Sequence, residues 1–431
     1  MSDTLRQAAE RRTFWGFAGD MFFFGFGISF AGQTTVIPSF LASLTSSAPL
    51  IGLAATISTG GWLLPQLFAA NRLAGHTRRK AAVAVPAAFG RFISLVLGPA
   101  MLLLAPRSPG TALAVFYLLY LAFWTLDGVA SVAWLDMMGG SLTAAARARL
   151  ISLGNVAPGI AGIGAGALVG IVLSTPTLPW PLNYSLLFLI CGSLWTLSLF
   201  SFLCVKESPS PAVPKPLPWP AYFRRLAEVV RGDPAFRRSV AVQLALSGVG
   251  IAAPFYIVHG LEVLGFPQAS VGLFTSVQLV GGVFSALLLG LLGERRGTRA
   301  VMHAWGWLAL GAPAIAIGAR ALVPALPGVV LYLYAGVFVI VGMQGMANMA
   351  GFLNWVLEYA PASDRPLYIG FANTLGGLSF IAPLIGGWIL AATGSYHVLF
   401  GIAALGPVAA LFLLRGLPEP RREVRAAGTI P

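Results

Sequence analysis

The stretch GLLGERRGTR, residues 290–299, places four charged side chains within six residues of a chain that is only 10% charged. It joins two apolar segments, 269–292 and 300–321, and each exceeds the about 20 residues that cross the hydrocarbon core of a bilayer. Charged side chains are costly in that core, so they gather in the turns between spans. We therefore interpret residues 290–299 as a tight turn at a membrane surface.

The composition of the whole chain agrees with this interpretation. Of its 431 residues 57% are hydrophobic, whereas a soluble domain is about 45–50% apolar and about 25% charged. We predict an all-α integral membrane protein with about twelve transmembrane helices. The predicted spans are 14–42, 49–71, 81–105, 111–138, 150–174, 183–205, 239–262, 269–292, 300–321, 327–357, 367–392 and 396–415.

A proline-rich stretch, KESPSPAVPKPLPWP at 206–220, divides these spans into two sets of six. Proline lacks the amide N–H that a helix needs, so this stretch indicates a linker. The following AYFRRLAEVVRG mixes apolar and basic residues at helical spacing, which predicts a helix along the membrane surface. We predict a six-helix bundle over 1–205, a cytoplasmic linker with an interfacial helix over 206–238, and a second bundle with a tail over 239–431.

The net charge of +13 follows from membrane topology. If both termini are cytoplasmic, nearly all Lys and Arg fall in cytoplasmic segments, which is the positive-inside pattern. This explains the basic charge without a nucleic-acid partner and predicts a multi-pass protein of the cytoplasmic (inner or plasma) membrane. The scattered histidines show no metal-ligand spacing, and no pattern of an enzyme active site or a cofactor site is present.

Matching features recur in the two sets of spans. The turn after the second span, NRLAGHTRRK at 71–80, corresponds to GLLGERRGTR after the eighth. Asp136 precedes Arg147 at the end of the fourth span, and Glu358 precedes Arg365 at the end of the tenth. We interpret Asp136 and Glu358 as loop charges. The recurrence indicates an internal duplication, which is common in transporters that bind substrate near mid-membrane.

The chain resembles the major facilitator superfamily. GLLGERRGTR is similar to the family's turn motif, Gly-x-Leu-[Asp/Gly]-[Asp/Glu]-Arg-x-Gly-x-[Arg/Lys], whereas the turn at 71–80 keeps only Leu73 and Lys80 of it. APLIGG at 382–387 is similar to the family's Gly-Pro-x-x-Gly-Gly. The resemblance implies two six-helix bundles, secondary transport by alternating access, and a monomer. It also implies a cytoplasmic gate at the basic turns, for which the candidates are Gly290, Gly293, Glu294, Arg295, Gly297, Arg299, Arg72, Arg78 and Arg79. The alternative is that these charges only fix topology.

Three ionisable residues fall inside predicted spans: Asp20, Arg91 and Asp127. At 1.5 Å per residue Arg91 and Asp127 have similar depths, so they are candidates for a buried ion pair. Such a pair either fixes packing or takes part in transport. Burial favours the protonated form of a carboxyl group, and a nearby arginine favours the ionised form. We therefore predict Asp20, which has no obvious basic neighbour, as the proton-coupling site, with Asp127 as a proton or substrate site.

Neutral polar and aromatic residues supply the candidates for substrate binding, which are Phe23, Phe26, Trp124, Gln243, Gln344 and Asn348. Each also has a structural interpretation, namely helix–helix hydrogen bonds for the amides and lipid-facing packing for the aromatics. We predict proton-coupled export of a small amphipathic compound. The alternatives are uptake of a nutrient by proton symport and a membrane sensor that binds a ligand without transporting it. The expected partners are the substrate, protons and the lipid bilayer.

Overall fold

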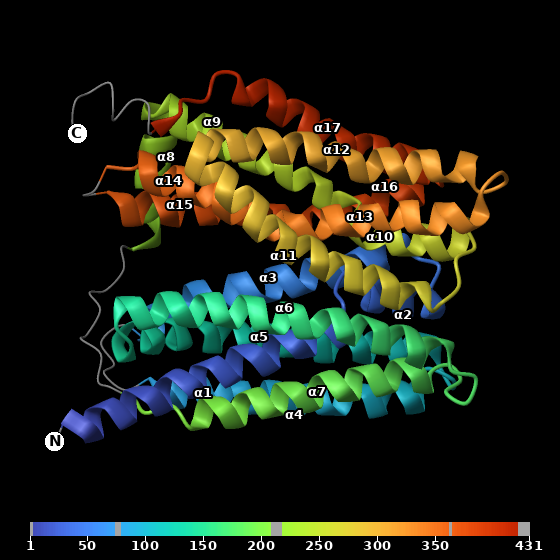
Figure 1. Cartoon of the computed structure of the whole chain (residues 1–431), viewed down its shortest axis with the longest axis horizontal. Coiled ribbons are helices and arrows are strands. Elements are labelled where there is room, and N and C mark those ends of the chain that lie inside the picture. The colour runs from blue at the N-terminus through green and yellow to red at the C-terminus, as the bar shows by residue number, and fades with distance from the viewer. Residues whose placement is uncertain (1–2, 74–78, 208–217, 362–363, 421–431) are drawn as a thin grey trace. The chain divides into compact units, whose positions relative to one another are not determined.

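Long apolar helices make up the computed structural model, which describes residues 3–73, 79–207, 218–361 and 364–420 (Figure 1). No strand occurs within these ranges. Eleven of the described helical segments are long and apolar enough to cross a membrane. This result confirms the predicted fold class, an all-α multi-pass membrane protein.

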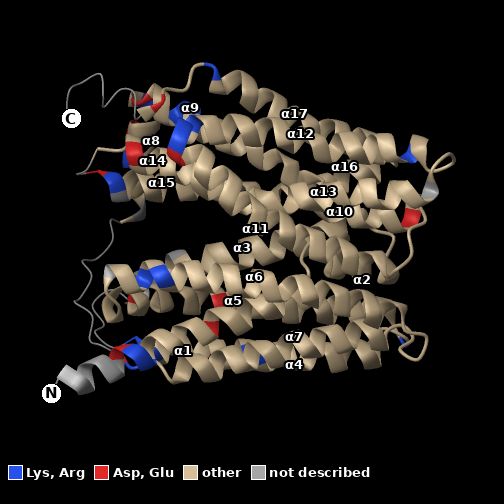
Figure 2. Cartoon of the chain, in the orientation of Figure 1, with Lys and Arg blue, Asp and Glu red and all other residues tan. Residues whose placement is uncertain are grey.

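The side chains are distributed as a bilayer requires. Figure 2 shows Lys, Arg, Asp and Glu concentrated toward the ends of the helices. Large apolar side chains such as Phe92 and Trp307 are exposed along the helices, at 65% and 67%. In a bilayer these surfaces contact lipid tails, so their exposure carries none of the cost that water would impose.

Contacts divide the chain into two compact units. Unit 1 comprises Met1–Pro216 with Pro267–Ser276, and unit 2 comprises Leu217–Phe266 with Val277–Pro431. Pro267–Ser276, called here the docked segment, belongs to unit 1 although it follows the first helices of unit 2 in sequence. The predicted division at 206–238 does not include this feature, and its exact boundaries stay a prediction.

Unit 1 is a bundle in which the long helices pack against one another. α1 contacts α6 and α7, α4 contacts α5 and α7, and α3 contacts α5. The helices are α1 (Asp3–Phe30), α2 (Val36–Leu44), α3 (Ala48–Leu73), α4 (Lys80–Leu104), α5 (Pro109–Ser141), α6 (Ala144–Ser174) and α7 (Leu182–Leu203). The hydroxyls of Ser108 and Thr143 accept hydrogen bonds from Thr111 N and Ala146 N and so cap the starts of α5 and α6.

The predicted first span, 14–42, is divided in the structure. α1 ends at Phe30 and α2 begins at Val36, so two helices replace one. α1 is not among the eleven apolar segments, because Asp20 and four glycines lower its mean hydropathy. The interpretation of Asp136 and Glu358 as loop charges is wrong, since both lie within helices, α5 and α14 (Asn354–Tyr359).

Unit 2 contains helices that change type along their length. The seventh predicted span comprises α9 (Pro234–Ser247), the 3-10 helix η1 (Gly248–Ile251), α10 (Ala253–Val258) and the π-helix η2 (His259–Val263). The tenth comprises α13 (Pro327–Ala347), the π-helix η3 (Asn348–Leu353) and α14, and the eleventh α15 (Arg365–Gly377), the 3-10 helix η4 (Leu378–Ile381) and α16 (Ala382–Thr393). The remaining helices are α8 (Trp219–Gly232), α11 (Ser270–Arg296), α12 (Thr298–Leu322) and α17 (Tyr396–Leu414).

The linker helix α8 packs against unit 2 through one face. Leu226 is buried, and Tyr222 donates or accepts a hydrogen bond of 2.9 Å with the hydroxyl of Thr374. Asp233 then caps α9 by accepting from Phe236 N, and it also accepts from the hydroxyls of Tyr359 and Tyr368. One carboxylate therefore ties α9 to α14 and α15.

The docked segment makes close backbone contact with α6. A Cβ added to Gly272 would lie 2.2 Å from Gly170 N and 2.4 Å from Gly166 O. The hydroxyl of Thr275 lies 2.8 Å from that of Thr35. Glycine at this position lets two helix backbones touch, and the hydroxyl pair adds a polar contact.

Candidate functional site

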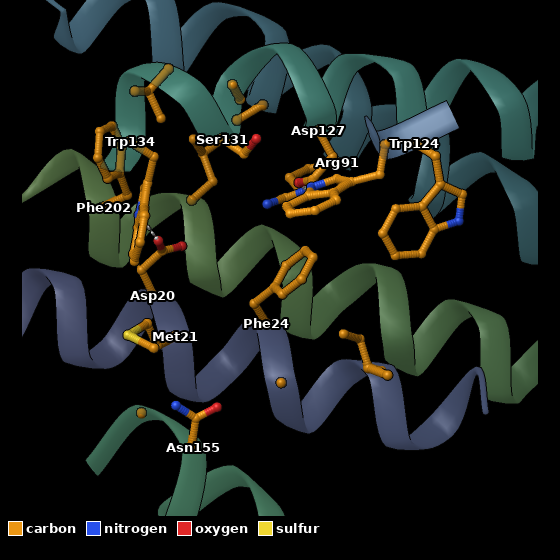
Figure 3. A pocket seen from close by; sticks show the side chains of 18 residues that line it. Asp20, Met21, Phe24, Arg91, Trp124, Asp127, Ser131, Trp134, Asn155 and Phe202 are labelled. Atoms are coloured by element: carbon orange, nitrogen blue, oxygen red, sulfur yellow. Dashed lines mark hydrogen bonds and ion pairs between the residues drawn. The ribbon is translucent and has the colours of Figure 1, made fainter. Parts of the chain in front are cut away.

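Unit 1 encloses a cavity of about 400 Å³ whose lining comes from α1, α3, α4, α5, α6 and α7 (Figure 3). The volume lies within the roughly 300–1,000 Å³ of small-molecule sites. Most of the lining is apolar or aromatic, and it includes Trp62, Trp124 and Trp134. The charged residues of the lining are Asp20, Arg91 and Asp127, the three that the sequence analysis placed inside spans.

Asp20 lies on α1 and is buried. Its Oδ2 accepts a hydrogen bond of 2.7 Å from Trp134 Nε1, and its Oδ1 accepts one from the hydroxyl of Ser198. Figure 3 shows Asp20 reaching from α1 toward Trp134. Among the described residues no cation forms an ion pair with Asp20. Two neutral donors therefore hold this carboxyl group, one from α5 and one from α7.

Arg91 and Asp127 form a buried ion pair between α4 and α5. Arg91 Nη1 lies 2.9 Å from Asp127 Oδ1, and the two side chains are 8% and 12% exposed. The pairing agrees with the similar depths inferred from sequence. If all three charged groups are ionised, two carboxylates and one guanidinium leave the cavity with a single net negative charge.

Aromatic rings surround the guanidinium of Arg91. Its Cζ lies 4.9 Å from the ring centroid of Phe24, 5.6 Å from that of Phe123 and 5.9 Å from that of Trp195. Phe123 and Trp195 stack with centroids 4.2 Å apart and planes 5° from parallel. Ring faces attract a cation, so this arrangement stabilises the charge and fixes the orientation of the guanidinium.

The predicted aromatic residues divide into two groups. Trp124 lines the cavity, whereas Phe23 and Phe26 do not, and the residue of that helix that does is Phe24. Phe23 and Phe26 are instead neighbours of Phe22, at centroid distances of 5.4 and 5.8 Å. The aromatic run on α1 covers all sides of the helix, so sequence spacing alone does not show which ring faces the cavity.

The predicted amides lie in unit 2 and are not part of this cavity. Gln243 is buried in α9, and its Oε1 has no hydrogen-bond partner within the described residues. Gln344 is half-buried near the end of α13, and Asn348 is exposed at the start of η3. A role for these amides in substrate binding stays a prediction.

The predicted gate residues lie at the start and end of the helices that flank the two basic turns. Glu294 and Arg295 are exposed in the last turn of α11. Gly297 has φ +88° between α11 and α12, a conformation that favours glycine. A Cβ added to Gly290 would meet no atom within 4 Å, whereas one added to Gly293 would lie 3.3 Å from the side chain of Val301. Arg78 lies outside the described residues, as does the side chain of Arg72.

Each turn is also held by a glutamate that sequence reasoning missed. In unit 1, Glu207 accepts from the backbone amides of Arg79 and Lys80 at the start of α4. In unit 2, Glu419 accepts from Arg299 N at 3.0 Å near the start of α12. Each glutamate follows the last predicted span of its bundle. Comparison of the segments that follow residues 203 and 414 would have found both glutamates in the sequence.

A cation in each turn complements this arrangement. Lys80 Nζ donates to the carbonyls of Leu203 and Val205, and Arg299 Nη2 donates to the carbonyl of Arg415. Positive charge is favourable beside the carbonyls at a helix C-terminus. In unit 1, Arg79 also pairs with Asp136 at 3.3 Å. Predicted gate residues thus have structural partners inside their own unit.

Comparisons with known proteins agree with the fold. Residues 244–429 match the sequence profile of the Major Facilitator Superfamily. A search of curated proteins finds no match. Among solved structures, a D-xylose-proton symporter aligns with a TM-score of 0.68 at 15% identity, covering 96% of this chain and 98% of that chain. The xylose transporter XylE from E. coli, in an inward open conformation, gives 0.65 at 14% identity with 95% and 96% coverage. The nucleoside transporter NupG gives 0.64 at 13% identity with 93% and 98% coverage.

Identities this low establish a shared fold and no more. The helical architecture defines a multi-pass membrane protein. The whole chain shares the fold of these solved transporters, and its second half also matches the sequence profile of the Major Facilitator Superfamily.

Proposed function

We propose that the protein couples proton movement to the transport of a small amphipathic compound by alternating access, with export as the direction. The observation that carries the proposal is Asp20, a buried carboxyl group that lines the cavity and is held by neutral donors. A carboxyl group removed from water and without an ion-pair partner favours its protonated form more than an exposed one does. Proton uptake and release at this position therefore fit a transport cycle.

The partners of Asp20 are compatible with both of its protonation states. A serine hydroxyl both donates and accepts, so Ser198 can donate to the carboxylate and accept from the protonated acid. The indole of Trp134 only donates, and it can bond to an oxygen of either form. We assign the proton to Asp20 and not to Asp127, because Asp127 is already engaged by Arg91 in an ion pair.

The walls of the cavity favour an amphipathic substrate. Trp62, Trp124 and Phe24 offer apolar surface, and Ser131 and Asn155 add neutral polar groups. Sites of this kind bury the apolar body of a ligand and orient it with a few polar contacts. We place the cavity in a monomer in the cytoplasmic membrane with both termini in the cytoplasm, as the distribution of Lys and Arg favours.

A reconstituted flux assay tests this function. Proteoliposomes containing a pH-sensitive dye are given a proton gradient and then a panel of lipophilic cations, aromatic acids, sugars and amino acids. We expect substrate-dependent proton movement that Asp20→Asn abolishes, while the control Glu228→Gln, an exposed carboxyl group on α8, retains it.

The same assay separates the alternatives. Proton and substrate moving in opposite directions support export, and movement in the same direction supports uptake by symport. Binding of a compound without any flux would identify a sensor. Full proton-driven flux in Asp20→Asn would remove Asp20 from the mechanism.

A further inference from the structure

The bonding of Arg91 is incomplete for a buried arginine. A guanidinium carries five N–H donors, and Arg91 uses one of its nitrogens, Nη1, in its bond to Asp127. Its Nε is buried and has no hydrogen-bond partner within the described residues. The residue as a whole is only 6% exposed, and it lines the cavity.

A purely structural ion pair would be built differently. Buried arginine–carboxylate pairs are frequently bidentate, and nearly all buried polar groups find a partner. The rings of Phe24, Phe123 and Trp195 approach the guanidinium. They stabilise its charge, but a ring is a poor substitute for an oxygen acceptor in the plane of the N–H groups. Arg91 is therefore fixed in position while at least one of its N–H groups, that of Nε, makes no hydrogen bond to any described residue.

The carboxyl group of Asp20, in contrast to the guanidinium of Arg91, has a hydrogen-bond partner for each of its polar atoms. Both of its oxygens already accept hydrogen bonds, from Ser198 and from Trp134. A cationic group of a substrate would have to share Asp20 with Ser198 and Trp134. An acceptor oxygen of a substrate could instead bond to an N–H group of Arg91 that has no partner in the described part of the chain. The imbalance favours a substrate that brings an acceptor.

We propose that Arg91 is a specificity-determining residue that donates hydrogen bonds to a carbonyl or carboxylate oxygen of the transported compound. This proposal rests on the proposed transport function and names the polar group of its substrate. The apolar body of the compound lies against Phe24 and Trp124, and Asp127 holds the guanidinium in place (Figure 3). A site that offers unpaired buried donors rejects analogues that lack the matching acceptor.

Matched probes test the proposal on purified full-length protein by isothermal titration calorimetry. The probes are 2-acetylnaphthalene, the 2-naphthoate anion, 2-isopropenylnaphthalene, which lacks the oxygen, and 2-naphthylmethylammonium, which offers only donors. We expect the oxygen-bearing probes to bind about 10- to 150-fold more tightly than the hydrocarbon, the range expected for a hydrogen bond to a charged group. Comparison of the ketone with the carboxylate shows which kind of oxygen the site prefers.

Two arginine variants and one partner variant locate the effect. Arg91→Met and Arg91→Leu carry no N–H donor in the side chain, so they should lose the preference for oxygen and leave binding of 2-isopropenylnaphthalene unchanged. Asp127→Asn retains the guanidinium and should retain the preference. If the arginine variants do not fold, the proposal is still tested by two other measurements. These are the comparison of ketone with hydrocarbon in the wild type and the titration of Asp127→Asn.

The proposal is overturned if wild type binds ketone and hydrocarbon equally, if it binds neither oxygen-bearing probe, or if the ammonium probe binds best. It is also overturned if the preference survives in folded Arg91→Met and Arg91→Leu, which supply no donor. Failure of the transport function is a separate result, because it appears as bound probe without flux in proteoliposomes.

Discussion

Replacement of Gly272 by alanine tests how tightly the docked segment is held in unit 1. The new Cβ would lie 2.2 Å from Gly170 N and 2.4 Å from Gly166 O, so backbone atoms rather than a flexible side chain must move. Overpacking of this kind costs about 1–3 kcal/mol. An equilibrium between docked and undocked segment would shift by about 5- to 150-fold toward undocked.

A disulfide reports the docked state directly. The hydroxyls of Thr35 and Thr275 are 2.8 Å apart, so cysteines at these two positions come within reach of a disulfide bond. The native Cys191 and Cys204 are first replaced by alanine, since both are free thiols. We expect rapid oxidation of the Thr35→Cys/Thr275→Cys protein and slower oxidation when Gly272→Ala is added, with the about 5- to 150-fold shift in the equilibrium as the upper limit of the change in rate.

Gly164→Ala is the matched control, because no atom of a neighbour lies within 4 Å of its added Cβ. Both substitutions raise helix propensity equally, by up to about 1 kcal/mol. The difference between them therefore isolates the steric effect. Equal oxidation rates in the two variants would refute the inference that backbone contact at Gly272 controls docking of this segment.

Three further predictions concern the ends of the helices. Glu294→Gln should change the rate of conformational exchange, measured by single-molecule fluorescence, and an unchanged rate would contradict a role in the gate. Asp233→Ala removes a helix cap and two tyrosine hydroxyl bonds and should cost about 2–4 kcal/mol in thermal unfolding, with Tyr359→Phe causing a smaller loss. Glu207→Ala and Glu419→Ala should each weaken the first turn of α4 or α12 by about 1 kcal/mol, seen as roughly fivefold faster amide exchange there. Exchange as slow as in wild type would exclude a capping role.

The sequence predicts the helices well because hydropathy and length decide them. Most predicted spans coincide with observed helical segments to within a few residues, as 300–321 does with α12. The exceptions depend on tertiary packing. The break between α1 and α2 and the π-helices η2 and η3 have no strong local signal, since glycine and small residues are common throughout this chain. Asp136 lies near the end of the predicted span, and only the packing of α4 against α5 shows that it pairs with Arg79.

The candidate site was predictable only in part. A constant rise per residue places Arg91 and Asp127 at equal depth, and the structure pairs them. The donors to Asp20 come from α5 and α7, so their identity depends on how three helices are rotated against one another. The aromatic rings around Arg91 also depend on how the helices are rotated, because Phe24, Phe123 and Trp195 lie on separate helices.

The two glutamates, Glu207 and Glu419, suggest a position at which the chain can be split into two separately produced fragments. Each one completes its bundle after the last membrane helix, so each bundle carries its own closing contact. If the chain were cut within residues 208–217, Glu207 would remain in the same fragment as Arg79 and Lys80, to whose amides it is bonded. Two fragments produced from separate genes would then each retain the glutamate contact of their own bundle, so co-expression of complementary halves is a feasible way to assemble this protein.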